Sequence, residues 1–219
     1  DMLYAFPNLR VEYAQAEPGV PFWFWRSVGH SQNVYFIEAF IDEIAAAAGR
    51  DPVEFRRSLL ARQPRLRGVL DLAAQKAGWG SPLPQGVHRG VAITNCFGSF
   101  VAQVAEVSMD ASGKPRVHRI VAAVDCGRTV NPDVIHRQVE GAIAYGLSAA
   151  LHGKITFRNG RVEQSNFDGY EVVRMGDAPL STRVHIVQSD APPAGVGEPG
   201  VPPMAPAICN AIFAATGKR

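Results

Sequence analysis

Cysteine is scarce in this chain of 219 residues, which contains only Cys96, Cys126 and Cys209. The three are odd in number and far apart, and no CxxC pair occurs, so the sequence supports neither a zinc site nor a disulfide framework. A continuous apolar run long enough to cross a membrane is also lacking. The six histidines show no ligand spacing with one another, and we therefore assign no metal ligand.

An excess of charge of either sign is absent as well. The formal net charge is +2 and 19% of the residues are charged. The basic residues are dispersed, as at Arg56-Arg57 and Arg65/Arg67, without the interleaved aromatic residues that a nucleic-acid groove needs. We therefore expect no nucleic-acid partner and interpret these arginines as solvated helix faces. The 47% apolar composition is typical of a globular protein with a buried core.

Residues 1–85 are predicted to form an extended, strand-like aromatic segment followed by a layer of helices. The first helix is expected over residues 31–50 and the third over 66–78. Between them, Asp51 is predicted to cap a second helix, with Pro52 at its first position and Glu54 completing a capping box. Apolar spacing predicts that one face of the first helix is buried, formed by Phe36, Ile37, Phe40, Ile41, Ile44 and Ala48.

Residues 86–219 are predicted to mix strands and helices, which gives an α+β fold class. Alternating Val- and Ile-rich sequence over 86–127 predicts antiparallel strands with a turn at 110–115. A long helix should begin at Asn131-Pro132 and end at Gly153. Asn159-Gly160 predicts a hairpin, residues 181–190 a further strand, and residues 203–216 a final helix.

Glu198 lies in the stretch Gly197-Glu198-Pro199-Gly200, where no neighbour has a polar side chain. An ionised carboxylate in such a loop loses hydration that something must replace. Glycines allow a ligand to approach closely, and prolines hold the loop in place, as a general base requires. The alternative is a glutamate that only complements the N-terminus of the final helix.

Gln138 and Arg26 are the other candidates for a binding site. Gln138 lies early in the helix after Asn131, and its neutral amide beside Gly141 suits contact with a polar heterocycle. The alternative is a surface glutamine on a helix whose glycines permit close packing. Arg26 follows an aromatic run that ends at Trp25, and its guanidinium suits an oxyanion. The alternative is stacking on Trp25 or pairing with a surface carboxylate.

Three long segments, in this order, resemble the large, molybdenum-cofactor-binding subunit of the xanthine oxidase family. The resemblance is strongest to the branch of isoquinoline 1-oxidoreductase beta subunits and related aldehyde dehydrogenases. The segments are WRSVGHSQNVYFIEAFIDEIAAAAGRDPVEFR, VDCGRTVNPDVIHRQVEGAIAYGLSAAL and GVGEPGVPPMAPAICNAIFAATG. The resemblance implies that Glu198 is the catalytic base and that Gln138 contacts the pyranopterin. It also implies that Arg26, Trp25 and Gly197 line the cofactor site.

The resemblance further implies hydroxylation of an N-heteroaromatic compound or an aldehyde, with water as the oxygen source. The implied cofactor is molybdenum-pyranopterin, and electrons would leave through iron–sulfur clusters on a small [2Fe-2S] partner subunit. The branch fits a bacterial cytoplasmic or periplasmic location and does not choose between them.

One departure from the family concerns length and two motifs. The family's large subunits are longer, and their Gly-Gln-Gly and Gly-Gly-Phe-Gly-like stretches do not occur here. We therefore expect the C-terminal part of a large subunit, with residues 1–85 and 86–219 as parts of it and an apolar surface facing the rest. The alternative is a non-catalytic binding or assembly domain of the same fold that does not itself bind the cofactor.

Overall fold

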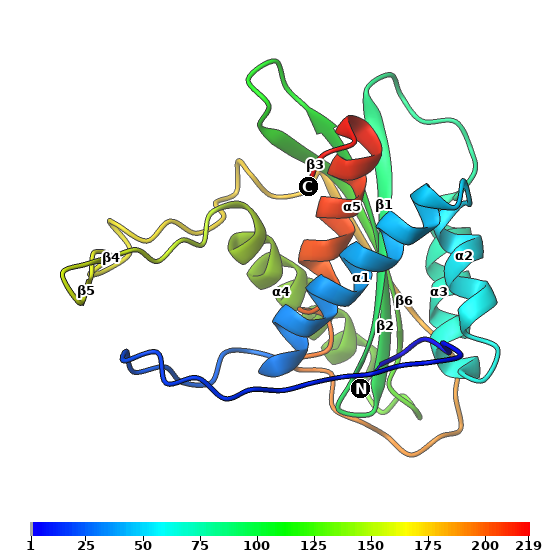
Figure 1. Cartoon of the computed structure of the whole chain (residues 1–219). Coiled ribbons are helices and arrows are strands. Elements are labelled where there is room, and N and C mark those ends of the chain that lie inside the picture. The colour runs from blue at the N-terminus through cyan, green and yellow to red at the C-terminus, as the bar shows by residue number, and fades with distance from the viewer. Residues whose placement is uncertain (1) are drawn as a thin grey trace.

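The computed structural model describes residues 2–219, in which a four-stranded sheet is covered by helices on both faces (Figure 1). Strands β1 (Val87–Cys96), β2 (Ser99–Met109) and β3 (Pro115–Asp125) form an antiparallel meander. Strand β6 (Ser181–Ile186) pairs with β3 in parallel, so the strand order is β1-β2-β3-β6. This arrangement confirms the α+β class and the predicted turn between β2 and β3.

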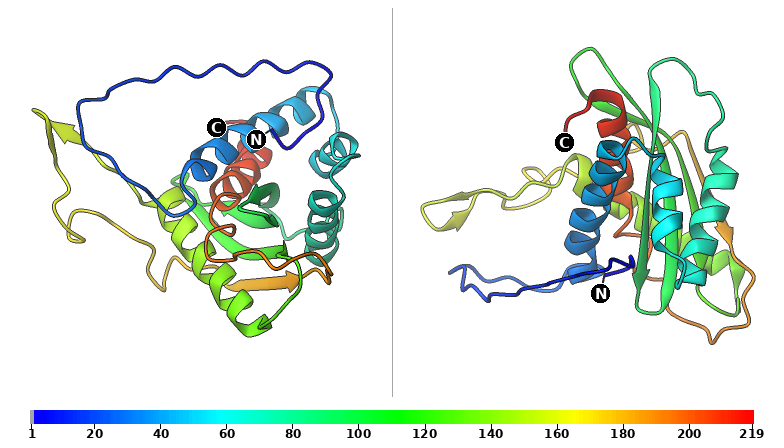
Figure 2. Two further views of the ribbon diagram at one scale, coloured as in Figure 1. Left: turned by 90° about the horizontal axis from the view of Figure 1, so that it is seen from below. Right: turned by 45° about the vertical axis from the view of Figure 1, so that its right-hand side comes forward.

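Each face of the sheet has its own apolar core, because successive strand residues point to opposite faces. On one face, α2 (Pro52–Leu59) and α3 (Pro64–Ala77) pack against Ile93, Val104 and their neighbours. On the other face, α4 (Pro132–Leu151) and α5 (Met204–Thr216) pack against Ala92, Ala105 and the residues next to them. Helix α1 (Gly29–Ala47) crosses α5 near the β1 edge (Figure 2). The strands are therefore apolar on both sides.

The predicted helix boundaries are confirmed where capping residues mark them. Asn131 Oδ1 accepts a 3.1 Å hydrogen bond from the backbone N–H of Val134, and Pro132 begins α4. Asp51 caps α2 through the N–H groups of Val53 and Glu54. The carboxylate of Glu54, however, pairs with the side chain of Arg57 in the next turn of the helix.

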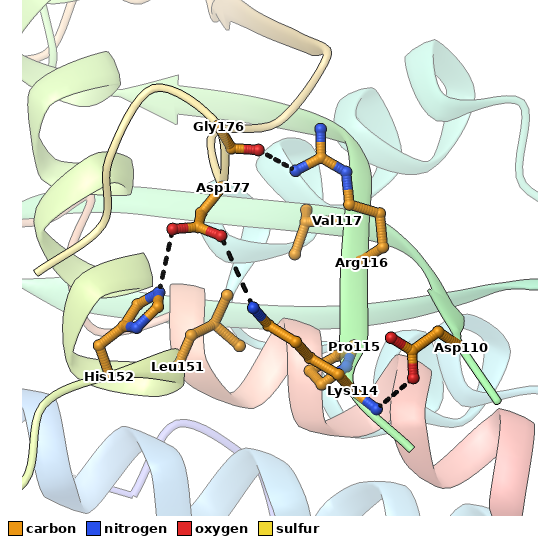
Figure 3. Close-up of a pocket in the computed structure, with 9 residues that line it drawn as sticks. All are labelled: Asp110, Lys114, Pro115, Arg116, Val117, Leu151, His152, Gly176 and Asp177. Atoms are coloured by element: carbon orange, nitrogen blue, oxygen red, sulfur yellow. Dashed lines mark hydrogen bonds and ion pairs between the residues drawn. The ribbon is translucent and has the colours of Figure 1, made fainter. Parts of the chain in front are cut away.

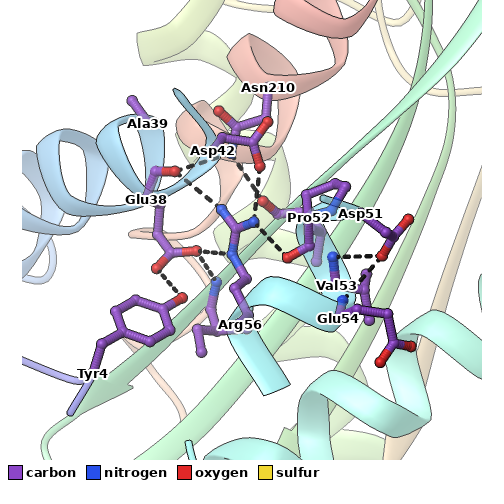
Figure 4. Close-up of polar contacts among 12 residues, drawn as sticks. Tyr4, Glu38, Ala39, Asp42, Asp51, Pro52, Val53, Glu54, Arg56 and Asn210 are labelled. Carbon is purple, nitrogen blue, oxygen red and sulfur yellow. Dashed lines mark hydrogen bonds and ion pairs between the residues drawn. The ribbon is translucent and has the colours of Figure 1, made fainter. Parts of the chain in front are cut away.

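The predicted buried face of α1 is wrong in part, because Phe36 and Phe40 are 64% and 61% exposed. The face turned toward the protein includes Glu38 and Asp42, which bind the guanidinium of Arg56 at 3.0 and 2.8 Å (Figure 4). Arg56 is fully buried, so its interpretation as a solvated residue is also wrong. Apolar spacing missed this face because its charged residues neutralise one another inside the protein.

Two segments project from the body, on the left in Figure 1. Residues 7–25 are extended but form no strand in the described structure, which corrects the strand-like prediction for this region. The backbone of this segment pairs with no strand of the described structure, and most of its side chains are exposed. The second segment, residues 153–180, contains the predicted Asn159-Gly160 hairpin between β4 (Phe157–Arg158) and β5 (Arg161–Val162). Among the helices of residues 2–219, none has the length and apolar character to span a membrane.

Candidate functional site around Glu198

The loop that contains Glu198 is tied to the sheet and to α4 at several points. The backbone N–H of Ala194 donates to the carbonyl of Cys126, and the Ser99 hydroxyl donates to the carbonyl of Gly195 at 2.7 Å. Further along, the buried Gln103 amide donates to the carbonyl of Gly200 at 2.8 Å. A Cβ at Gly200 would lie 2.8 Å from the Cβ of a helix α4 residue, so this close approach requires glycine.

The half-buried carboxylate of Glu198 is held by the turn before α1 rather than by the final helix. The backbone N–H of Ser27 donates to Oε1 at 3.0 Å, and the Ser27 hydroxyl donates to the Glu198 carbonyl at 2.7 Å. No hydrogen bond to Oε2 comes from residues 2–219. Helix α5 has no side-chain cap in the described structure, so Glu198 makes no capping hydrogen bond to it.

Arg26 joins the Glu198 loop to helix α4. Its Nε donates to the carbonyl of Gly197 at 2.7 Å, and its Nη2 contacts that carbonyl and lies 3.5 Å from the carbonyl of Gln138. The guanidinium lies 5.6 Å from the ring centroid of Tyr145, which also packs against Trp25 at 4.8 Å. Arg26 therefore neither stacks on Trp25 nor pairs with a carboxylate in the part of the chain that is described.

Gln138 is exposed on the side of α4 that faces Arg26, and its amide lies beside the loop that contains Glu198. A Cβ built on Gly197 would lie 3.9 Å from Oε1 of Gln138, so the amide oxygen is next to the loop backbone. No hydrogen bond of the Gln138 side chain is found within residues 2–219. Gly141 faces open space, whereas a Cβ at Gly146 would lie 2.8 Å from Met204. Close helix packing thus accounts for Gly146 and not for Gly141.

The end of β1 completes the surroundings of Glu198. Burial, reinforced by the negative charge of Glu198, raises the pKa of the Cys96 thiol to about 12. Cys96 pairs across the hairpin with Ser99, whose hydroxyl binds the Glu198 loop, and its thiol is protonated at neutral pH. The buried Oγ1 of Thr94 and Oε1 of Gln103 have no hydrogen-bond partner within the described residues. Burying a polar atom without a hydrogen-bond partner is unfavourable. This side of the loop therefore contains polar atoms whose hydrogen-bonding capacity is not filled by the described residues.

The structure therefore brings together all five predicted site residues: Glu198, Gly197, Gln138, Arg26 and Trp25. Sequence reasoning missed three more, Ser27, Tyr145 and Cys96. Tyr145 follows Gln138 by seven residues, two helical turns, and this spacing could have placed both on one face. Ser27 and Cys96 had no local signal, because they reach the site only through tertiary packing.

A cleft and a groove elsewhere on the described part of the chain can be compared with this site. A polar cleft of about 250 Å³ lies between the β2–β3 turn and the end of α4, where His152 is 3.6 Å from Asp177 (Figure 3). None of the residues described around Glu198 lines this cleft. A mainly apolar groove of about 530 Å³ runs between α1, α4 and α5 and begins at Trp25. Of the two, the groove shares Trp25 with the candidate site, and the cleft shares none of its residues.

The chain is similar to known proteins over nearly all of its length. Residues 67–179 match the model of the molybdopterin cofactor-binding domain. The beta subunit of isoquinoline 1-oxidoreductase from Brevundimonas diminuta is 33% identical over 99% of this chain and 28% of its own length. One subunit of the nicotinate dehydrogenase from Pseudomonas putida is 31% identical over 99% of this chain and 20% of its own. A membrane-bound aldehyde dehydrogenase from Gluconacetobacter polyoxogenes is 33% identical over 91% of this chain and 28% of its own length. The chain thus spans between a fifth and three tenths of these relatives.

Solved structures support the same fold. The aldehyde oxidoreductase of Desulfovibrio gigas superposes with a TM-score of 0.72 at 15% identity, over 89% of this chain and 40% of that one. Quinoline 2-oxidoreductase from Pseudomonas putida 86 has a TM-score of 0.51 at 24% identity, over 54% of this chain and 16% of that one. The family match covers more than half of the chain, and the relatives extend it over nearly all of the rest. The chain belongs to the molybdenum-cofactor-binding subunits of the xanthine oxidase family, which are molybdopterin-dependent oxidoreductases.

Proposed function

We propose that this chain supplies the proton-accepting side of a molybdenum hydroxylase large subunit. The reaction would oxidise an N-heteroaromatic compound or an aldehyde with water as the oxygen source. The observation that carries the proposal is the Glu198 carboxylate, of which one oxygen is anchored by Ser27 while Oε2 has no partner within residues 2–219. A carboxylate held in this way has one oxygen free to take a proton from a bound group.

The donor set around the loop fits a molybdenum-pyranopterin. Arg26 offers a cation for an anionic group, and its Nη1 makes no hydrogen bond within the described residues. The Gln138 amide can both donate to and accept from a heterocycle. Gly141 leaves open space on the same helix face. When bound, the cofactor would supply the two-electron redox chemistry.

The chain's own residues would then orient the site and move a proton. Arg26 and Ser27 are consecutive, and they bind the backbone of Gly197 and Glu198 respectively. These two bonds, from neighbouring side chains to neighbouring carbonyls, hold the loop that contains the base close to the guanidinium. Such preorganisation is what general-base catalysis requires, because the acceptor must lie within hydrogen-bond reach of its proton.

The rest of the large subunit and a small [2Fe-2S] subunit are the proposed partners. The exposed face of α1 forms an apolar groove of about 540 Å³ with the N-terminal segment, lined by Met2, Phe6, Leu9, Phe36, Ile37, Phe40, Ile41 and Ile44. An exposed apolar groove of this kind suits a protein contact. Because the relatives extend well beyond this chain, we propose that the remaining part of the same subunit covers the groove.

The test of the function is Glu198→Gln in the full large subunit, purified with its small subunit. Turnover of isoquinoline and of benzaldehyde should fall about 10²–10⁴-fold, because the amide cannot accept the proton. Molybdenum and pterin content should stay unchanged. The matched control is Glu140→Gln on the exposed side of α4, which should keep full turnover.

Two results would argue against the proposal. Turnover that survives Glu198→Gln would remove Glu198 from the chemistry. Absence of molybdenum and pterin from the complete parent enzyme would favour the alternative, a binding or assembly domain that does not itself hold the cofactor.

A further inference from the structure

Strand β2 carries one long polar side chain on the face of the sheet that α4 and α5 cover. Gln103 is fully buried there, and its direct neighbours across the sheet are Ala92 on β1 and Ala122 on β3. Both alanines belong to the apolar core of that face. Cross-strand neighbours share a face, so the glutamine lies between two small apolar residues. A buried polar side chain in such surroundings calls for a specific explanation.

The described residues use only half of the Gln103 amide. Its Nε2 donates to the carbonyl of Gly200 at 2.8 Å, whereas its Oε1 has no hydrogen-bond partner within residues 2–219. The opposite assignment of the amide would place an oxygen against the Gly200 carbonyl, so the donor is the end that faces the loop. A buried acceptor without a partner destabilises the folded state. What the side chain contributes in return is therefore the bond to Gly200.

That bond fixes the turn that contains Glu198. The N–H of Val201 donates to the Glu198 carbonyl at 3.0 Å, so residues 198–201 form a closed turn with Gly200 inside it. On the side of α4, a Cβ at Gly200 would lie 2.8 Å from the Cβ of Ala142. The turn is thus held between the helix, which packs against it, and the sheet, from which Gln103 reaches its backbone.

We infer that Gln103 is a positioning residue, whose buried amide holds the turn from the sheet and so sets the place of the Glu198 carboxylate. The inference rests on the proposed function and goes beyond it by assigning a role to a residue outside the site. Ser27 binds the turn at the Glu198 carbonyl, and Gln103 binds it two residues further on. One anchored carbonyl leaves the turn free to pivot, and the second removes that freedom. A general base needs such a fixed position, because it must lie within hydrogen-bond reach of its proton.

The test is Gln103→Met in the full large subunit, purified with its small subunit. Methionine has a similar length but cannot donate to the Gly200 carbonyl. The kcat for isoquinoline and for benzaldehyde should fall about 10-fold through misplacement of the base. KM should change less than about 2-fold, since a fully buried residue does not touch the substrate. Molybdenum and pterin content should stay unchanged.

Amide hydrogen exchange gives a measurement that does not depend on turnover. The peptide that covers residues 194–201 should exchange about 10-fold faster in Gln103→Met, because the turn opens more often. Gln103→Asn keeps an amide but shortens the side chain, so it should show the same faster exchange and the same loss of kcat.

Asn210→Leu is the matched control. Asn210 is also a fully buried amide that donates to a backbone carbonyl, that of Val91 at 2.9 Å. Val91 lies five residues, or about 17 Å, along β1 from Cys96, away from the Glu198 loop. Asn210→Leu should lower the melting temperature at least as much as Gln103→Met. It should leave kcat and the exchange of residues 194–201 unchanged.

The inference is overturned if Gln103→Met keeps the parent's exchange at residues 194–201 or its kcat. It is also overturned if Asn210→Leu lowers kcat in parallel, since general destabilisation would then explain both variants. Where neither compound is turned over by the parent, the exchange measurement decides. The two proposals fail separately. Full turnover by Glu198→Gln contradicts the base, whereas unchanged exchange in Gln103→Met contradicts only the positioning role.

Discussion

The backbone N–H of Ser27 donates a 3.0 Å hydrogen bond to Oε1 of Glu198, across 171 residues of sequence. Ser27 has a φ of 72° and the following Val28 a φ of 47°, so the chain reverses sharply at this contact before α1 begins. The orientation of the carboxylate therefore depends on a backbone group, and substitutions at Ser27 can keep it. A substitution at Ser27 therefore removes the hydroxyl bond while keeping the N–H bond, so the contribution of the hydroxyl can be measured by itself.

Ser27→Gly should be tolerated better than Ser27→Ala. Both substitutions remove the hydroxyl bond to the Glu198 carbonyl, at a cost of about 1 kcal/mol. Glycine adopts a φ of 72° without strain, whereas alanine does not, so the alanine variant should be less stable by about a further 1 kcal/mol. Urea unfolding of the two variants measures the difference. Equal stability would show that the left-handed conformation at Ser27 costs nothing.

Arg56→Met should destabilise the protein by about 3–5 kcal/mol, because Glu38 and Asp42 would remain buried without their partner. The neighbouring Arg57 is only partly buried and pairs at the surface with Asp71, so Arg57→Ala should cost about 1 kcal/mol or less. Chemical denaturation at neutral pH compares the pair. Similar losses in the two variants would mean that the buried cluster contributes no more than a surface ion pair.

The stability of the protein should depend on pH in the acid range, because Arg65 lowers the pKa of the Asp125 carboxyl. Hydrogen bonds from the Arg65 guanidinium, at 2.6 and 2.7 Å, hold the pKa of the Asp125 carboxyl below its ordinary range, although burial acts in the opposite direction. The unfolded chain has an ordinary aspartate pKa of about 3.9. The stabilisation is therefore complete above that value and is lost as pH falls through the lower, folded pKa.

Arg65→Met should accordingly be less stable than the parent at pH 7, and this gap should shrink as pH falls below about 4. Urea midpoints across the acid range measure the gap. Arg67→Met is the control, because Arg67 lies at the surface, 3.7 Å from Asp71, and should give a small gap. A gap for Arg65→Met that stays constant with pH would mean that its cost comes from lost packing on Phe100.

Gly90→Ala should be severely destabilising, whereas Gly68→Ala should stabilise. A Cβ at Gly90 would lie 2.2 Å from the backbone carbonyl of Ala207, so α5 would have to move away from β1. We expect a loss above about 3 kcal/mol, in the range of overpacked cores. Gly68 is within α3 with open space around it, and alanine there should add about 1 kcal/mol through helix propensity. Thermal unfolding distinguishes the two, and a mild effect at Gly90 would contradict the close packing of α5 on the sheet.

The elements of this fold were predictable where the signal is local. Asn131 with Pro132, Asp51 with Pro52, and Gly217 mark helix ends within a few residues of themselves. The Asn159-Gly160 turn is equally local. The apolar loop around Glu198 likewise drew attention to a carboxylate whose Oε2 has no hydrogen-bond partner within residues 2–219. In each case the physical cause lies within about four positions of the residue concerned.

Tertiary structure alone decided which side of α1 is buried and what the dispersed arginines do. Periodicity selected Phe36 and Phe40, yet the pairing of Glu38 with Arg56 turned the opposite face inward. Arg65, interpreted as solvated, binds Asp125 at the end of β3, 60 residues away. The assembly of Arg26, Gln138 and Glu198 into one site also required the complete fold, although each residue type was recognisable by itself. Sequence determines local conformation and chemical type, because both depend on near neighbours. Ion pairs and sites between distant segments depend on packing, which brings those segments together only in the folded chain.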